Sequence, residues 1–108
     1  MHTKLSVIMP VYHEGEIINN AISHLVSIMP KSSAEIIVVD GDTQKSTINK
    51  ICYDGIKKIV GPTGRGPQMN AGAALAEGDI LLFLHADTVL PFNATHHILS
   101  SCSEKDCA

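Results

Sequence analysis

Short, mostly apolar runs recur along the chain, separated by stretches with helical spacing. The runs are Val7–Val11, Ile36–Val39, Lys57–Val60 and Ile80–Leu84. Continuous rather than alternating apolar residues are typical of strands covered on both faces. Strands that alternate with helices indicate a mostly parallel sheet with right-handed crossovers. The pattern therefore predicts an α/β fold.

Apolar residues at three- and four-residue spacing predict a first helix over Glu14–Met29, which Pro30 ends. A weaker pattern predicts a second helix within Thr43–Gly55. The third helix is better marked, because Pro67 suits its first position and Gly78 suits the residue just past its end. Its alanines would let it lie close on the sheet. A last helix is expected from Pro91, within a poorly defined tail over residues 92–108.

Composition limits the function classes. The 108 residues allow one domain, and 44% hydrophobic and 18% charged residues are typical of a soluble globular protein. A net charge of −3 does not indicate the basic surface that is typical of a nucleic-acid-binding protein. Apolar runs of about five residues are far below the roughly 20 that span a bilayer. The N-terminus lacks a signal-peptide pattern, and an odd number of scattered cysteines argues against a disulfide framework. We expect a cytoplasmic protein without a transmembrane segment.

Each apolar run leads into a cluster of polar residues or glycines. The clusters are Tyr12–Glu14, Asp40–Asp42, Gly61–Gly66 and His85–Asp87. In open α/β sheets, ligands bind outside the carboxyl ends of the strands. One sheet edge should therefore gather carboxylates, an arginine and a glycine-rich loop. That combination favours a metal-bound nucleotide diphosphate.

The Asp40-Gly41-Asp42 turn has two interpretations. A carboxylate at this place can accept a hydrogen bond from a nucleobase N–H or a ribose hydroxyl. The alternative is a structural turn at Gly41 with Asp42 as a helix cap. The sequence favours a functional role for Asp40 and leaves Asp42 open.

The loop from Gly61 to Pro67 is too rich in glycine and proline to be helical. Its backbone N–H groups could line a diphosphate, with Arg65 adding a charge-assisted fork and the next helix N-terminus pointing at the same place. It is neither G-x-G-x-x-G nor a P-loop, so an ordinary loop is the alternative. Gln68 and Asn70 could reach ligand or loop, or be surface residues.

His85-Ala86-Asp87 ends the most hydrophobic run. A carboxylate at the mouth of a buried strand needs solvent, a partner or a metal. Mg²⁺ or Mn²⁺ bridging two phosphates is a common solution. The alternative is that Asp87 caps the following turn and His85 is hydrogen-bonded at the sheet edge.

Taken together, four segments resemble the family 2 glycosyltransferases of the GT-A fold, from Leu5 to about Pro91: Ser6–Glu14, Val38–Asp42, Gly64–Gly72 and Leu84–Thr88. The closest resemblance is to a bacterial branch in which the usual Asp-x-Asp reads His-Ala-Asp. The resemblance implies a Rossmann-like, three-layer α/β/α fold with strand order 3-2-1-4. It also implies a nucleotide diphosphate-sugar donor, in particular a UDP-sugar, bound with Mg²⁺ or Mn²⁺.

The resemblance also assigns roles to residues. Pro10, Tyr12 and Glu14 would line the nucleotide pocket, and Asp40 would receive the base. Arg65 would lie near the base or diphosphate, and Asp87 would bind the cation. Two positions depart from the family pattern: His13 replaces a common asparagine, and His85 replaces the first acid of Asp-x-Asp. A neutral imidazole at position 85 could still bind a ribose hydroxyl or Mn²⁺.

Length is the larger departure. Family members continue with strands and helices that hold the acceptor pocket and, in inverting enzymes, the general base, and the first 91 residues place no such base. We therefore expect an incomplete nucleotide-sugar-binding domain over residues 1–108, unable to transfer sugar to its unknown acceptor by itself. The alternative is a non-catalytic nucleotide-binding module. A nucleotidyltransferase is disfavoured by Tyr12-His13-Glu14, and a dinucleotide oxidoreductase by the missing glycines of the first turn. The edge of Ile80–Leu84 should be open to self-association.

Overall fold

The structure is a computed structural model that describes residues 4–29 and 34–88. The elements follow in the order β1 (Leu5–Val11), α1 (Ile18–Ile28), β2 (Ala34–Asp40), the 3₁₀ turn η1 (Ile48–Lys50), β3 (Lys57–Val60), α2 (Arg65–Leu75) and β4 (Ile80–Phe83). Strands alternate with helices as expected except between β2 and β3. The helix expected from Pro91 and the tail over residues 92–108 lie outside the described residues. Among the described residues, no helix has the length and apolar content to cross a bilayer.

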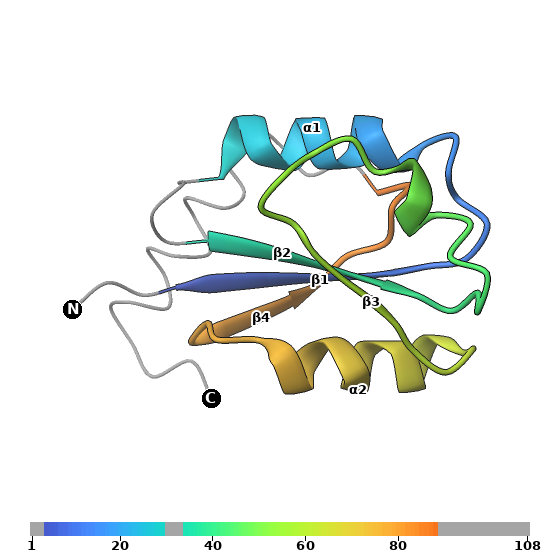
Figure 1. Cartoon of the computed structure of the whole chain (residues 1–108). Helices are drawn as coiled ribbons and strands as arrows, with labels where there is room; N and C mark the ends of the chain where they lie inside the picture. The colour runs from blue at the N-terminus through green and yellow to red at the C-terminus, as the bar shows by residue number, and fades with distance from the viewer. Residues whose placement is uncertain (1–3, 30–33, 89–108) are drawn as a thin grey trace.

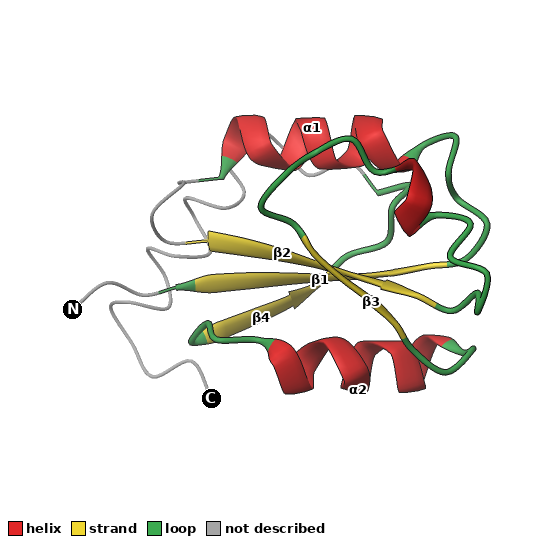
Figure 2. Cartoon of the chain, in the orientation of Figure 1, coloured by secondary structure: helices red, strands yellow, loops and turns green. Residues whose placement is uncertain are grey.

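The four strands form one parallel sheet in the order β3-β2-β1-β4, which confirms the expected strand order. β1 lies inside the sheet and pairs with β2 along its whole length, from Leu5 opposite Ala34 to Val11 opposite Asp40. Helix α1 covers one face of the sheet and α2 the other (Figure 1). The colouring of Figure 2 shows the same three layers, so the expected α/β/α architecture is confirmed.

Side chains of β1 alternate between two apolar layers. On the α1 face, residues of the strand pack with one stripe of the helix, formed by Leu5, Val7, Met9 and Val11 with Ile18, Ile22 and Leu25. On the α2 face, Ile8 packs with Ile37 and Val39. α2 approaches the sheet closely at Gly72, because a Cβ there would lie 2.5 Å from Cγ2 of Ile8. The small residues of α2 therefore bring the helix down onto the sheet, as expected.

The helix expected within Thr43–Gly55 does not form. Its place is taken by turns and the single 3₁₀ turn η1. Lys45 adopts a positive φ of 61°, which ends any right-handed helix at that point. The Asp40 carboxylate accepts the N–H groups of Thr47 and Ile48, which would otherwise enter a helical ladder. Tertiary hydrogen bonds outweigh the weak local pattern.

The boundaries of the two long helices also shift. α1 begins at Ile18 rather than Glu14, because the segment between them turns and the Glu14 carbonyl accepts the N–H groups of Ile17 and Ile18. α2 begins at Arg65, two positions before Pro67, and ends at Leu75. Gly78 therefore does not end it. Gly78 instead lies against Ser6, whose Oγ accepts its N–H at 2.9 Å.

Candidate functional site

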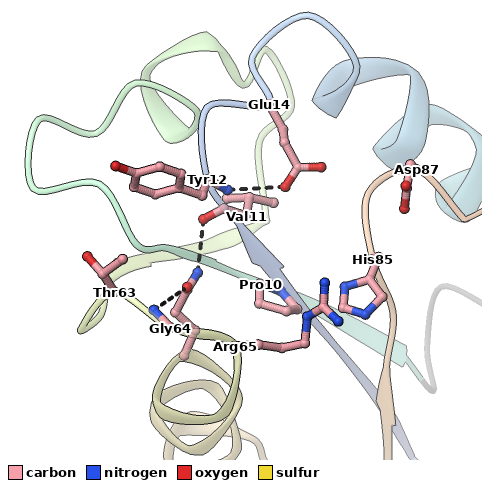
Figure 3. A pocket seen from close by; sticks show the side chains of 10 residues that line it. Pro10, Val11, Tyr12, Glu14, Thr63, Gly64, Arg65, His85 and Asp87 are labelled. Carbon is pink, nitrogen blue, oxygen red and sulfur yellow. Dashed lines mark hydrogen bonds between the residues drawn. The ribbon is translucent and has the colours of Figure 1, made fainter.

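A pocket of about 370 Å³ opens at the carboxyl edge of the sheet, where β1 and β4 end and α2 begins (Figure 3). Its size is within the range of small-molecule sites. The lining residues come from three separate stretches of chain: Pro10, Val11, Tyr12 and Glu14; Thr63, Gly64, Arg65 and Gln68; His85 and Asp87. Seven of the ten predicted site residues are therefore brought together, and Asp40, Asp42 and Asn70 are outside this lining.

Pro10 explains why the sheet opens at this point. β4 pairs with β1 only as far as Ile8, and the last bond of this ladder runs from the Leu84 N–H to the Ile8 carbonyl at 3.0 Å. The next bond would need an N–H from residue 10, and proline has none. The chain after β4 is thereby free to leave β1. His85 and Asp87 then line the pocket opposite the end of β1.

The turn after β1 places Tyr12 and Glu14 over the pocket. Tyr12 is 48% exposed, and its backbone N–H donates to Oε1 of Glu14 at 3.1 Å. His13 between them has a positive φ of 52°, which reverses the chain. The Glu14 N–H donates to Oγ1 of buried Thr47 at 2.9 Å, which holds the turn against the loop after β2. The Tyr12 ring and the Glu14 carboxylate are therefore presented by an ordered turn (Figure 3).

The start of α2 supplies the positive side of the pocket. Gly64 has a φ of 130°, which favours glycine, and Arg65 is the first residue of the helix. Backbone N–H groups at a helix N-terminus favour anions. In Figure 3 the exposed Arg65 side chain extends from the start of α2 toward His85. A cationic fork and a helix N-terminus therefore face the same cavity.

The end of β4 supplies the acidic side. His85 is half-buried, Asp87 is exposed, and the Thr88 N–H donates to the His85 carbonyl at 3.0 Å, which closes a turn around Asp87. Among the described residues, no three of the His, Cys, Asp and Glu side chains form a ready-made cluster for a metal ion. One carboxylate with an adjacent imidazole suffices only when the ligand supplies further oxygens.

Asp40 has a role different from the expected one. The residue is 0% exposed, so in this structure its carboxylate cannot receive a base. One oxygen accepts the Asp42 N–H at 2.9 Å, and the other accepts those of Thr47 and Ile48 at 2.9 and 3.1 Å. Asp40 therefore folds the loop after β2 back onto the sheet. The sequence favoured a ligand role because a carboxylate that faces solvent and one that turns inward have the same pattern.

Asp42 and Asn70 also lie away from the pocket lining. Oδ1 of Asp42 accepts the Gln44 N–H at 3.0 Å, which closes a local turn, and no helix follows for Asp42 to cap. A hydrogen bond from the Ser46 side chain, followed by the one from Gln44, lowers the pKa of the Asp42 carboxyl. Asn70 is exposed on α2.

Sequence reasoning missed two residues that shape the site. Thr63 was read only as part of a glycine-rich loop, yet its Oγ1 donates to the Gly41 carbonyl at 2.6 Å. Thr47 is buried and receives contacts from both Glu14 and Asp40. Neither has a local signal, because a threonine in a polar loop has the same pattern whether it faces solvent or joins two loops.

The family described as glycosyl transferase family 2 matches residues 6–107. A poly(ribitol-phosphate) beta-glucosyltransferase of Bacillus spizizenii is 31% identical over 93 residues, which are 78% of this chain and 15% of the relative. Glycosyltransferase AglE of Haloferax volcanii is 33% identical over 91 residues, covering 77% of this chain and 30% of AglE. The chain thus spans less than a third of either relative.

Solved structures show the same fold. S. aureus TarS 1–349 superposes with a TM-score of 0.79 at 25% identity, covering 94% of this chain and 32% of TarS 1–349. Its complex with UDP gives a TM-score of 0.76. The mannosyltransferase PcManGT from Pyrobaculum calidifontis, in complex with GDP-Man and Mn²⁺, gives 0.72 at 20% identity, covers 84% of this chain and 29% of PcManGT, and supports the fold alone. On the family match over nearly its whole length, the chain belongs to glycosyl transferase family 2.

Proposed function

We propose that the pocket binds the nucleotide diphosphate of a sugar donor, and that this chain is the donor-binding part of a glycosyltransferase. The main support is that one cavity has Arg65 and the N-terminus of α2 on one side and His85 and Asp87 on the other. The first pair suits a diphosphate and the second suits the cation that accompanies it. The transfer itself would move the sugar to an acceptor hydroxyl.

The phosphate side rests on Arg65. Guanidinium forks bind phosphate through two parallel hydrogen bonds, and the first N–H groups of α2 add fixed partial charge. The α2 helix is 11 residues long, so its N-terminal dipole is developed. Gly64 and Thr63 bring the backbone of the loop to the same wall of the pocket.

The cation side rests on Asp87. Mg²⁺ is commonly held by one or two carboxylates together with substrate phosphates, so a single exposed carboxylate fits such an ion, whether Mg²⁺ or Mn²⁺. His85 replaces the first acid of the family motif, in a His-Ala-Asp variant, and its imidazole can hydrogen-bond the donor or coordinate Mn²⁺. A bound divalent cation would neutralise charge on the departing diphosphate.

The nucleoside side rests on the end of β1. The half-exposed Tyr12 ring offers an apolar face to the nucleoside, and the Glu14 carboxylate can accept a hydrogen bond from a nucleoside hydroxyl. The Asp40 carboxylate already accepts backbone N–H groups. The base would therefore be recognised by the turn after β1 and by main-chain groups near this turn. Likeness to TarS, solved with UDP, favours a uridine nucleotide.

Catalysis by this chain alone is not part of the proposal. The base that deprotonates the acceptor must lie across the sugar from the diphosphate, and no described residue is assigned to that place. Because the chain covers 15% and 30% of the two relatives, the acceptor side would come from further sequence. The chain by itself would then act as a nucleotide-binding module.

Calorimetric titration with UDP tests the proposal. The wild-type chain should bind UDP more tightly with Mn²⁺ than with EDTA. Asp87→Asn should remove this difference, whereas Asp54→Asn, an exposed carboxylate outside the pocket, should keep it. Arg65→Ala should weaken binding by about tenfold or more, as expected for a lost charged hydrogen bond. Lys58→Ala, an exposed cation on β3, is its matched control.

Two results would count against it. If the folded chain binds no nucleoside diphosphate at millimolar concentration, the pocket assignment is wrong. If chelation leaves the affinity unchanged, the diphosphate site stands and the cation role of Asp87 does not.

A further inference from the structure

We propose that Gln68 is a positioning residue, whose buried amide fixes the loop carrying Arg65 against the ends of β1 and β2. This inference rests on the proposed function, because it concerns the same pocket. The sequence made Gln68 a candidate donor-contacting residue, with a contact to the loop or a surface position as the alternatives. The structure instead shows its amide engaged with the protein backbone, so its effect on a donor would pass through the loop it holds.

The Gln68 side chain forms a three-way junction. It is 4% exposed, and its Nε2 donates to the carbonyls of Val11 and Val39, both at 2.9 Å. Its Oε1 accepts the Gly64 N–H at 3.1 Å. Val11 and Val39 are at the ends of neighbouring strands, and Gly64 precedes Arg65. Dashed lines in Figure 3 mark the bonds that reach Val11 and Gly64.

Only an amide can bond all three backbone groups through one side chain, although the Val11 carbonyl also accepts the Gly41 N–H at 2.9 Å. Two carbonyls need two donors, and one N–H needs an acceptor, which together match the hydrogen-bonding capacity of glutamine. A glutamate would set a carboxylate against two carbonyl oxygens. A methionine of similar length would remove the acceptor of the Gly64 N–H and one donor from each carbonyl, in a place where water has little access, while the Val11 carbonyl would keep the Gly41 N–H.

Thr63 reinforces the same junction. Its hydroxyl donates to the Gly41 carbonyl at 2.6 Å, next to the end of β2. The loop is therefore attached to the sheet at two points on either side of Gly64. Arg65 follows directly, so movement of the loop would move its guanidinium relative to Asp87 across the pocket.

Gly41 leaves the space that the junction occupies. A Cβ at this position would lie 2.7 Å from Oε1 and 2.8 Å from Cδ of Gln68. The closest contacts of that Cβ are all with the Gln68 side chain. An alanine at position 41 should therefore displace the amide, and removal of the amide should make the alanine harmless.

The first test compares Gln68→Met with Ser6→Ala in the full chain. Ser6 is equally buried and bonds Glu35 and Gly78 at the opposite, amino end of the sheet, so its variant loses stability without touching the pocket. We expect Gln68→Met to weaken UDP binding by about tenfold at a temperature where both variants are folded. Ser6→Ala should bind UDP as the wild type does. Equal UDP affinities for Gln68→Met and the wild type would overturn the positioning role.

Hydrogen exchange gives a readout that needs no ligand. The Gly64 N–H should exchange faster in Gln68→Met than in the wild type, while the Asp42 N–H, held by Asp40, should not change. Unchanged exchange at Gly64 would contradict the junction even if UDP affinity fell. If the wild type itself bound no UDP, the proposed function would fail, and exchange at Gly64 would still decide whether Gln68 holds the loop.

Two further comparisons separate positioning from packing. The carboxyl introduced by Gln68→Glu is buried, so its pKa should be raised, and protonation restores one donor. The affinity of the Gln68→Glu variant for UDP, relative to that of the wild type at each pH, should recover as pH falls from about 8 to about 5. Gly41→Ala should weaken binding alone, but add nothing to Gln68→Ala in the double variant. Additive losses in the double variant, or a flat pH profile, would contradict the proposal.

Discussion

At the scale of single residues, Asp40 shows how a carboxylate at a strand end can serve the fold instead of a ligand. Its two oxygens accept three backbone N–H groups, and these bonds order the loop between β2 and β3. Hydrophobic pattern predicted its position at the carboxyl edge correctly. The direction of its side chain depends on Thr47 and Ile48, which approach only in the folded chain, so no local pattern could reveal it.

Asp40→Asn should therefore destabilise the protein rather than only weaken nucleotide binding. Only the oxygen of an amide can accept hydrogen bonds, so at least one buried N–H would lose its acceptor. We therefore expect a loss of about 3 kcal/mol in the free energy of unfolding. Urea denaturation measures this loss, with the exposed Asp54→Asn as control. A change as small as that of the control would restore Asp40 as a candidate for base recognition.

At the scale of elements, strands were predictable and loops were not. Continuous apolar runs placed β1, β2 and β4, whereas the run that placed β3 begins with two lysines, and the family resemblance gave the strand order. The strand positions then predict that Tyr12, Arg65 and Asp87 lie in one pocket, because the carboxyl ends of parallel strands share one edge of the sheet. The prediction of a helix after β2 was wrong, because Lys45 turns the chain and the Asp40 carboxylate accepts N–H groups that a helix would need. Gln68 was placed near the site, but its junction depends on three distant backbone groups.

Two glycines of α2 should respond oppositely to alanine. A Cβ at Gly72 would meet Cγ2 of Ile8 at 2.5 Å and Cγ2 of Val39 at 3.0 Å, so Gly72→Ala should cost about 1–3 kcal/mol through overpacking. No atom lies within 4 Å of a Cβ at Gly66, so Gly66→Ala should stabilise the helix by about 0.5–1 kcal/mol. Thermal denaturation of both variants measures the difference. The same sign for both would contradict the packing of α2 on β1.

An ionic cluster at the amino end of the sheet joins β1, β2, β3 and the end of α2. Lys57 lies 2.8 Å from Glu35 and 3.0 Å from Glu77, and Ser6 also donates to Glu35. Burial raises the pKa of the Glu35 carboxyl, but hydrogen bonds from Lys57, Ser6 and the Glu77 N–H outweigh burial and lower the pKa to about 2. The ionised form is therefore the one that the fold stabilises.

Because this folded pKa is below the ordinary value of 4.5, the stabilisation is complete above about pH 4.5 and is lost as pH falls toward about 2. Glu35→Gln should lower stability at neutral pH and flatten its decline across this acidic window. Urea denaturation at several pH values measures both effects. A variant whose stability declines as steeply as that of the wild type would show that other carboxyls control acid unfolding.

At the scale of the whole molecule, β4 is the edge strand of the described sheet. Its Leu81 and Phe83 side chains are 41% and 43% exposed, on the face where α2 covers β1 and β2. Open strand edges beside apolar side chains pair readily with another copy.

We therefore expect the isolated chain to self-associate through β4. Sedimentation at micromolar concentration should report dimers or larger species. Leu81→Lys combined with Phe83→Lys should shift the population to monomers, because charged side chains blunt an edge. Val60→Lys, an exposed apolar residue on the opposite edge strand, is the matched control and should leave association unchanged. A monomeric wild type would show that this edge is already protected.

The most direct test of the central claim is a UDP titration with Mn²⁺ followed through backbone amide signals by NMR. The account predicts that the signals of Tyr12, Gly64, Arg65 and Asp87 shift together as UDP is added. Signals at the opposite end of the sheet, such as those of Ser6 and Glu77, should stay in place. Shifts confined to that opposite end, or none at all with UDP in excess, would contradict a nucleotide site at the carboxyl edge.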